Sequence, residues 1–160
     1  MSPGEDLSRI RAFLVPLGEF QMLLPNATVA EVVDYHVPRP VEGAPAWMLG
    51  IYNWRGRDLP LYSQEHAMGQ RAPAPDRRAR ILIINGLTQA RGAAQYGIVT
   101  RGIPHLVMVD RNNIEAREQM LKSPVVRAFA RLDDANVLIP DLDRVEAMLA
   151  GVMANVSASA

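Results

Sequence analysis

The sequence contains no cysteine, which excludes a disulfide framework, thiolate catalysis and any cysteine-ligated zinc or iron–sulfur site. It also lacks a long apolar run: no stretch approaches the roughly 18 residues that a membrane-spanning helix needs. The N-terminal residues MSPGEDLSRIRAF have no apolar segment of the kind that a secretory signal contains. Together these absences predict a protein of a reducing, cytoplasmic compartment.

An excess of charge of either sign is missing as well. Lysine plus arginine number 17 and aspartate plus glutamate number 17. A protein that follows the phosphates of a nucleic acid would be expected to carry a basic excess. The balance therefore disfavours nucleic acid as the main partner.

The motifs that usually carry catalysis are not present. There is no phosphate-binding G-x-x-x-x-G-K-[ST] loop and no dinucleotide-binding G-x-G-x-x-G after a strand. His36, His66 and His105 are spread along the chain without the spacing of a helical metal-binding pair. Ser63 and Ser123 lack the neighbouring residues of an acyl-transfer nucleophile. We therefore predict no catalytic activity, no cofactor and no metal.

What the chain does contain is a series of short apolar segments separated by turns. Its 12 prolines are spread along the whole length, which favours a turn-rich β architecture. The pattern predicts a mainly β protein, built as an antiparallel barrel or a pair of barrels. Gly18 is expected to supply a positive φ in the loop of the first hairpin. The expected strands are residues 13–17, 20–24, 29–35, 47–52, 59–62, 80–84, 95–100, 106–109, 125–132 and 137–139, and the expected helices are 63–68, 114–121 and 142–152. We expect one domain over residues 11–152, with flexible tails at 1–10 and 153–160.

The stretch WMLGIYNWRGRDLPLY, residues 47–62, places an arginine and a glycine between two apolar strands. Gly56 would permit a backbone geometry that a side chain blocks, and Asn53 can hydrogen-bond the turn. Arg55 would then be held at the rim, able to contact a carboxylate through two hydrogen bonds. The residues alone leave two interpretations open: a partner-binding element, or a structural corner with Arg55 paired inside its own domain.

A second basic feature is the segment from Arg71 to Arg80, RAPAPDRRAR. It suggests an alternative function as a small β-barrel module that binds nucleic acid or another ligand, with salt-dependent affinity. A solvated linker is the favoured interpretation, because Asp76 dilutes the positive charge and no aromatic side chains are interleaved for base stacking. A hydrolase with an unrecognised site is the weakest alternative.

The order of these segments resembles the CheW-like coupling proteins of bacterial chemosensory arrays. The likeness is strongest where residues 44–51 (APAWMLGI) lead into Asn53-Trp54-Arg55-Gly56 and then into Leu59-Pro60-Leu61. It extends from the hairpin at Phe13, through Gly97-Ile98-Val99, to residues 130–134 (ARLDD) and 141–144 (DLDR). It covers nearly the whole chain.

This resemblance implies a fold and a role. The fold would be two interleaved five-stranded SH3-like barrels, with a short helix after the first half and a helix at the C-terminus. The role would be a non-catalytic adaptor that joins the cytoplasmic tip of methyl-accepting chemoreceptors to the regulatory domain of a CheA-like histidine kinase. Any membrane association would be indirect, through the receptors.

The resemblance also implies the site. Asn53, Arg55 and Gly56, together with Trp54, occupy the corner that is implicated in coupling to receptor and kinase. Glu31 falls where an acidic residue often lies close to that arginine, which predicts a Glu31–Arg55 pair. An apolar groove between the barrels is expected to be edged by Met48, Ile98 and Val99.

The sequence departs from the family pattern in three places. Ser63-Gln64 stands where an Asp-Leu pair is usual, and Arg101, the last residue of Gly97-Ile98-Val99-Thr100-Arg101, stands where an acidic residue is common. Trp54 is bulkier than the usual aliphatic residue. These departures suggest a divergent paralogue, such as the coupling proteins of type IV pilus (twitching motility) systems.

Overall fold

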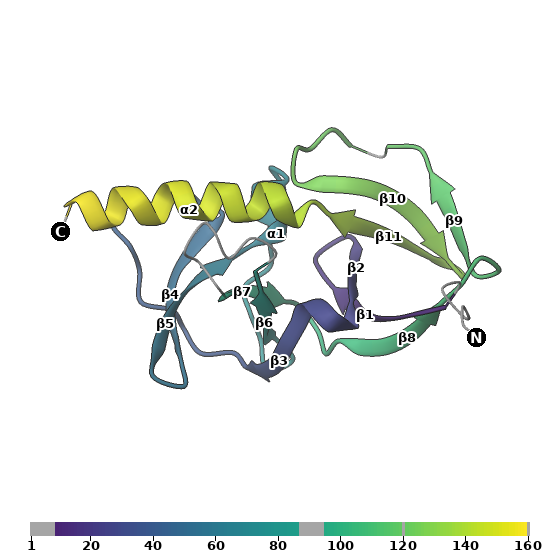
Figure 1. Cartoon of the computed structure of the whole chain (residues 1–160), viewed down its shortest axis with the longest axis horizontal. Coiled ribbons are helices and arrows are strands. Elements are labelled where there is room, and N and C mark those ends of the chain that lie inside the picture. Colours follow the sequence, from purple (N-terminus) through teal and green to yellow (C-terminus); the bar gives the residue numbers. More distant parts are fainter. Residues whose placement is uncertain (1–8, 87–94, 120, 160) are drawn as a thin grey trace, which may run out of the picture.

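A computed structural model of the chain describes residues 9–86, 95–119 and 121–159 (Figure 1). Most of the tail predicted at 1–10 therefore lies outside the described residues, and β1 begins at Ile10. Eleven strands form two mixed sheets, one of six strands and one of five. The prediction of a mainly β chain is confirmed.

The six-stranded sheet combines the two ends of the chain, and we call it the terminal sheet. It comprises β1 (Ile10–Pro16), β2 (Gln21–Pro25), β8 (His105–Val109), β9 (Ile114–Arg117), β10 (Val126–Leu132) and β11 (Ala135–Pro140), in the order β8-β1-β2-β11-β10-β9. The first hairpin is joined to the last one by a parallel pairing of β2 with β11. The first hairpin thus belongs to the half of the molecule that the C-terminal strands build, so the halves are interleaved as predicted.

The five-stranded sheet uses the middle of the chain, and we call it the middle sheet. It comprises β3 (Val29–Asp34), β4 (Met48–Trp54), β5 (Arg57–Tyr62), β6 (Arg80–Asn85) and β7 (Gln95–Thr100), in the order β3-β6-β7-β5-β4. A short 3₁₀ turn, η1 (Asn26–Thr28), leads from β2 into β3.

The two sheets repeat one plan that spacing in the sequence does not reveal. In each sheet two groups of antiparallel strands are joined by one parallel pairing. In the terminal sheet β2 pairs with β11, and in the middle sheet β7 pairs with β5. The β4–β5 and β10–β11 hairpins occupy corresponding places in these orders. Their turns contain the two non-glycine residues with positive φ among the described residues, Arg55 and Asp133, each at 53°. The terminal sheet differs by one additional edge strand, β9.

Each repeat continues into a helix. α1 (Gln64–Ala67) follows β5; the Ser63 side chain caps it by accepting a hydrogen bond from the His66 amide, and Gly69 follows it with φ 75°. α2 (Leu142–Ser159) follows β11 and extends beyond the predicted 142–152. In Figure 1, α2 runs across one side of the molecule from the junction of the two sheets.

A shared apolar core fixes the two sheets against each other. Buried residues of β1, β2, β10 and β11 pack with residues of β5, β6 and β7, and α2 adds Leu142, Val145 and Leu149. Two smaller clusters lie within the individual halves. Burial of this apolar surface is the main stabilising contribution, and it holds the turns of both sheets in a fixed relation.

Two local predictions are wrong. The helix predicted at 114–121 does not form at its start: Ile114–Arg117 is strand β9 instead, because Ile114 pairs with Leu132 and Arg117 with Phe129 at the open edge of β10. Pairing with an available strand outweighs a local helical pattern. The extra strand also makes the terminal sheet six-stranded, whereas the middle sheet has the five strands expected.

Gly18 also differs from its prediction, since it does not have a positive φ. The first hairpin closes through a longer loop, in which the Leu17 amide donates to the Phe20 carbonyl at 2.9 Å. The Gly18 amide instead donates to Glu65 Oε2 at 3.1 Å. Its role is contact with the other half of the molecule.

Candidate functional site

The β4–β5 connection is a two-residue turn formed by Arg55 and Gly56, with φ of 53° and 79°. Positive φ at both central residues is the geometry of a type I′ turn, which matches the twist of a hairpin. Asn53 and Trp54, expected in the corner, belong to the end of β4. A residue with a Cβ in the left-handed region costs roughly 1–2 kcal/mol, so the arginine at this position is not explained by backbone preference.

The base of the turn is fixed by side-chain hydrogen bonds, as the sequence predicted for Asn53. Asn53 Oδ1 accepts from the Gly56 amide at 3.3 Å, and Asn53 Nδ2 donates to Asp58 Oδ1 at 3.1 Å. Arg39 Nη2 lies 3.3 Å from Asp58 Oδ2. The hydrogen bond from Asn53, and then that from Arg39, lower the pKa of the exposed Asp58 carboxyl. These contacts restrict the directions in which the turn can present Arg55.

Above this base, Glu31, Trp54 and Arg55 form a cluster. Glu31 Oε1 accepts from Trp54 Nε1 at 2.8 Å and lies 3.1 Å from Arg55 Nη2. The Arg55 guanidinium carbon is 5.2 Å from the centroid of the Trp54 ring, a cation–π distance. The predicted contact between Glu31 and Arg55 is confirmed, and Trp54 is its third member.

The cluster joins strands that are not paired in the sheet. Glu31 is on β3 and Trp54 on β4, which lie at opposite ends of the middle sheet's strand order. A second link has the same effect, since Tyr52 Oη donates to the carbonyl oxygen of Asp34 at 3.3 Å. The middle sheet therefore curls until its edge strands meet, and side chains rather than a backbone ladder hold the edges together.

Arg55 is paired within its own domain and also presented to solvent. Its side chain is 69% exposed, whereas that of Glu31 is 35% exposed. The two interpretations left open by the sequence are therefore compatible. The internal contacts orient the guanidinium, and most of its surface stays open for a partner.

The residues expected to edge a groove are in the interior. Ile98 and Val99 are completely buried and Met48 is 4% exposed. Ile98 belongs to the shared core and Val99 to the cluster of the middle sheet, on opposite faces of β7. The expectation that these three side chains edge an exposed groove is wrong. Ile98 and Val99 lie on β7, an inner strand between β6 and β5, and Met48, at the start of β4, is buried as well. The uninterrupted apolar run Ile98-Val99 was a signal of a strand covered on both faces.

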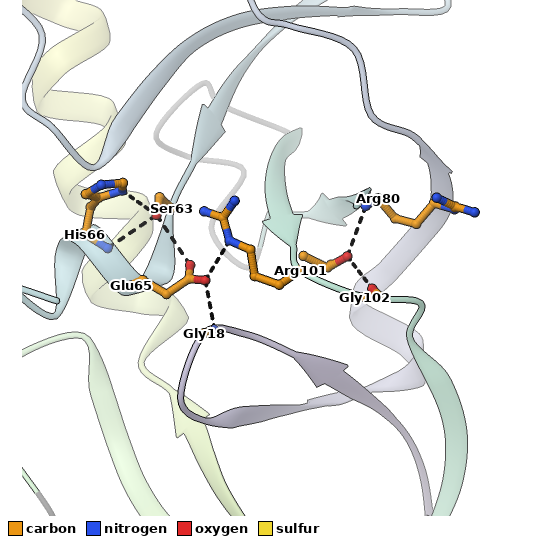
Figure 2. A network of polar contacts seen from close by, with 8 residues as sticks. Gly18, Ser63, Glu65, His66, Arg80, Arg101 and Gly102 are labelled. Atoms are coloured by element: carbon orange, nitrogen blue, oxygen red, sulfur yellow. Dashed lines mark hydrogen bonds and ion pairs between the residues drawn. The ribbon is translucent and has the colours of Figure 1, made fainter. Parts of the chain in front are cut away.

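A buried polar network was missed by the sequence reasoning. The side chains of Glu65, on α1, and Arg101 are only 1% and 9% exposed. Glu65 Oε2 lies 2.9 Å from Arg101 Nε. Figure 2 shows how the Gly18 amide and the Ser63 hydroxyl also point to this carboxylate, at 3.1 and 3.4 Å. His66 Nδ1 lies 2.9 Å from Ser63 Oγ. The only signal in the sequence was Arg101, a basic residue at a position where the family commonly has an acidic one.

This network connects the two halves of the molecule. Gly18 lies in the β1–β2 loop of the terminal sheet, while Glu65 and Arg101 follow β5 and β7 of the middle sheet. The Arg101 amide also donates to the carbonyl oxygen of Pro16 in β1 at 2.8 Å. The contacts therefore set the orientation of the sheets next to the shared core.

The segment from Arg71 to Arg80 runs mostly without regular structure on the surface, up to the start of β6 at Arg80. Arg80 Nη1 donates to the carbonyl oxygens of Arg77 and Ala79 at 2.9 and 2.8 Å. Part of the positive charge is thus used locally. The alternative of nucleic-acid or ligand binding through this segment stays an untested prediction.

Two further observations concern residues 9–86, 95–119 and 121–159. No group of three or more His, Asp or Glu side chains in this part of the chain is arranged to hold a metal ion. Neither of its helices combines the length and apolar character that crossing a membrane would require.

The chain is thus a two-sheet β protein with an exposed arginine on a turn whose geometry is restricted by side-chain hydrogen bonds. The comparisons with known proteins name the family. The model of the CheW-like domain matches residues 11–148, and the chain belongs to this family. Among solved structures, the scaffolding protein TtCheW from Thermoanaerobacter tengcongensis is similar with a TM-score of 0.73 and 21% identity, over 89% of this chain and 90% of that one. At that identity the likeness establishes the fold alone. No curated protein matches the chain significantly.

Proposed function

We propose that this protein is a non-catalytic adaptor of a bacterial chemosensory pathway, and that it binds its partners through the β4–β5 turn. The observation that carries the proposal is the cluster of Glu31, Trp54 and Arg55, which holds a 69% exposed guanidinium on a turn of restricted geometry. Membership of the CheW-like family supports the same role, since this is a family of scaffolds without catalytic activity.

Stability alone does not account for an arginine at this position. Exposed ion pairs contribute a median of about 0–1 kcal/mol, and a left-handed residue with a Cβ costs roughly 1–2 kcal/mol. Glycine or asparagine would satisfy the turn better. A guanidinium that is already held in one orientation is suited to form two parallel hydrogen bonds with a carboxylate of a partner. This comparison supports a role of Arg55 in recognition.

The proposed partners are the cytoplasmic tip of a methyl-accepting chemoreceptor and the regulatory domain of a CheA-like histidine kinase. The protein would work in the cytoplasm and reach the membrane only through the receptors. We expect affinities of micromolar order, as is common for transient signalling contacts.

The deciding experiment is a binding assay with two purified partners, a receptor signalling tip and a kinase regulatory domain. Each is titrated against the intact chain by calorimetry. Saturable binding to both supports the coupling role. Failure to bind either partner overturns it.

The Glu31–Arg55 pair is tested by exchanging its charges. If the pair orients the turn, E31K and R55E each lose coupling and the swapped double variant recovers part of it. Recovery is expected to be incomplete, because Glu31 also accepts the hydrogen bond of Trp54. E31Q is the matched control, since it removes the charge and keeps an acceptor for Trp54. The absence of any recovery in the double variant would contradict the pairing.

We further propose that the output is pilus-based, as in twitching motility. Two of the three departures from the family pattern lie in the interior. Ser63 and Gln64 are completely buried, and Gln64 Nε2 donates to the Val125 carbonyl at 3.2 Å. Arg101 lies in the buried network between the halves. The third departure, Trp54, lies beside the turn, where it contacts Glu31 and Arg55. Divergence at the junction of the sheets, with Asn53, Arg55 and Gly56 retained, supports a paralogue that keeps the coupling surface. A deletion strain that loses twitching and keeps swimming is the expected result, and the reverse phenotype would contradict this branch.

A further inference from the structure

One end of the middle sheet, next to the β4–β5 turn, carries a rim of side chains with polar groups. Each residue of this rim lies two or four positions along its strand from a member of the apolar cluster of the middle sheet, and therefore on the same face of the sheet. Hydrogen bonds link the rim residues across the strands. The rim residues are Glu31 (β3), Trp54 (β4), Arg57 (β5), Asn85 (β6) and Gln95 (β7).

Two neutral amides hold Arg57 in this rim. Arg57 Nη1 donates to Gln95 Oε1 at 3.1 Å, and Gln95 Nε2 donates to Asn85 Oδ1 at 3.2 Å. Asn85 and Gln95 lie directly opposite each other in the antiparallel pairing of β6 with β7, so the chain of hydrogen bonds follows the sheet. A carboxamide donates and accepts hydrogen bonds without carrying a charge. These contacts therefore orient Arg57 and leave its charge unneutralised.

The other two arginines around the turn differ from Arg57 in this respect. Arg55 Nη2 lies 3.1 Å from Glu31 Oε1, and Arg39 Nη2 lies 3.3 Å from Asp58 Oδ2. Each of these guanidiniums thus has a carboxylate of the same chain beside it. The ion pairs among the described residues include none of Arg57. Of the three arginines, Arg57 is therefore the one that these ion pairs leave uncompensated.

The segments next to Arg57 do not supply the missing negative charge. Asp58 follows it in the chain, but successive side chains of a strand point to opposite faces, and the Asp58 carboxylate accepts two hydrogen bonds of its own. Residues 87–94, which lie between β6 and β7 outside the described residues, include no acidic residue. Arg57 is exposed, as Arg55 is. In Figure 1 the hairpin that carries both arginines points away from the terminal sheet, so a partner can reach them.

We propose that Arg57 is a second recognition residue of the coupling surface, and that the bound protein partner places two carboxylates there, one on Arg55 and one on Arg57. This inference rests on the proposed function. Glu31 already balances Arg55, so the unmatched charge of Arg57 makes the rim complementary to an acidic surface. Complementary charges across an interface fix its register and speed association. Because Gln95 already holds the guanidinium, Arg57 loses less freedom when the partner binds.

The test removes the charge of Arg57 in one variant and compensates it in place in another. R57Q removes the guanidinium, whereas Q95E keeps Arg57 and turns its amide partner into a carboxylate of the same shape. In calorimetric titrations of the intact chain with the receptor tip and the kinase regulatory domain, each variant should bind at least one partner about tenfold more weakly, the loss of one charge-assisted hydrogen bond. The loss should shrink as the salt concentration rises. Q95E should keep Tm at or above that of the parent, because it adds an ion pair; a purely structural role of Arg57 would not combine this with weaker binding.

R111Q is the matched control, because Arg111 is exposed in the β8–β9 connection of the other half and its loss changes the net charge by the same amount. Binding by R111Q should equal that of the parent. If R111Q weakens binding as much as R57Q, the effect is one of net charge and the role of Arg57 is overturned. If the parent binds but R57Q or Q95E binds both partners as tightly, only the role of Arg57 is overturned. If the parent binds neither partner, the proposed function fails, and this inference fails with it.

Discussion

Replacement of Arg55 by glycine separates recognition from stability. The substitution removes the guanidinium from the turn and places there the residue that tolerates a positive φ best. Glu31 keeps its hydrogen bond with Trp54 in the variant, because that contact does not involve Arg55. We expect R55G to fold like the parent chain and to lose affinity for its partners.

The expected change in stability follows from four contributions. Loss of an ion pair between side chains that are 69% and 35% exposed costs about 0.2–1 kcal/mol. Loss of the contact with the Trp54 ring costs about 0.5–1 kcal/mol. Removal of the arginine side chain from a left-handed position stabilises the variant by roughly 1–2 kcal/mol. The greater flexibility of glycine in the unfolded chain destabilises it by about 0.5–1 kcal/mol. The net free energy of unfolding should therefore lie between about 2 kcal/mol below and about 1 kcal/mol above that of the parent, and each kcal/mol shifts Tm by about 2–4 °C at this length.

The expected loss in binding is larger. An arginine at the centre of an interface commonly contributes 2 kcal/mol or more, about 30-fold in Kd. Calorimetric titrations with the receptor tip and with the kinase regulatory domain measure this change, and thermal denaturation measures stability. D133G is the matched control, because Asp133 has the same φ of 53° in the corresponding turn of the other half. D133G should leave binding unchanged.

Two results would refute the reasoning. If R55G lowers the free energy of unfolding by more than about 3 kcal/mol, a range typical of buried interactions, Arg55 is a structural residue. If R55G folds normally and binds both partners with the affinity of the parent, the turn is not the coupling surface. Equal loss of binding in D133G would show that the effect comes from turn dynamics rather than from the guanidinium.

The remaining predictions concern the interior and the base of the turn. G50A should lower the free energy of unfolding by about 3 kcal/mol, because the added Cβ would lie 2.4 Å from the Arg39 carbonyl oxygen. G56A should lower it by only about 1–2 kcal/mol, because a Cβ on Gly56 has open space around it. Equal shifts of Tm in the two variants would contradict this. E65A should cost about 3–5 kcal/mol in urea denaturation, since it leaves the guanidinium of Arg101 buried without its carboxylate; a change below about 1 kcal/mol, as for an exposed pair, would show that water reaches the site. Because the pKa of Asp58 is lowered on folding, its stabilising contribution is complete above the ordinary aspartate pKa and is lost as the pH falls through the lowered value. An NMR titration of its carboxyl carbon that gives an ordinary or raised pKa would disprove this.

Local patterns were sufficient to predict much of the fold and the turn. The two hairpins at the ends of the chain, the β4–β5 hairpin and the capped helix after Ser63 all depend on contacts between residues close in sequence. The Glu31–Arg55 contact joins distant strands, and it came from the family resemblance rather than from spacing. Nothing in the sequence indicated that Trp54 would share the same carboxylate oxygen.

The errors arose where distant pairing decided the outcome. Ile114 begins a strand only because β10 offers an open edge, which a local window cannot detect. Ile98 and Val99 were assigned to a surface because their motif is near the family's coupling region, although an apolar pair on an inner strand is buried on both faces. Glu65 and Arg101 lie 36 positions apart, and their pairing depends on the packing of the two sheets.

The parallel pairing of β2 with β11 has a consequence for synthesis on the ribosome. The strands of the middle sheet lie between residues 29 and 100, so this half can assemble while the remainder of the nascent chain is still being translated. The first hairpin emerges before any of these strands, yet its neighbours in the terminal sheet are translated after residue 100. Until then β2 has no partner on the side of β11, and Met22 and Leu24, both completely buried in the finished protein, lack the part of the shared core that β10, β11 and α2 supply. They present apolar surface of the kind that chaperones hold. The first hairpin is therefore translated before the middle sheet and reaches its native environment after it.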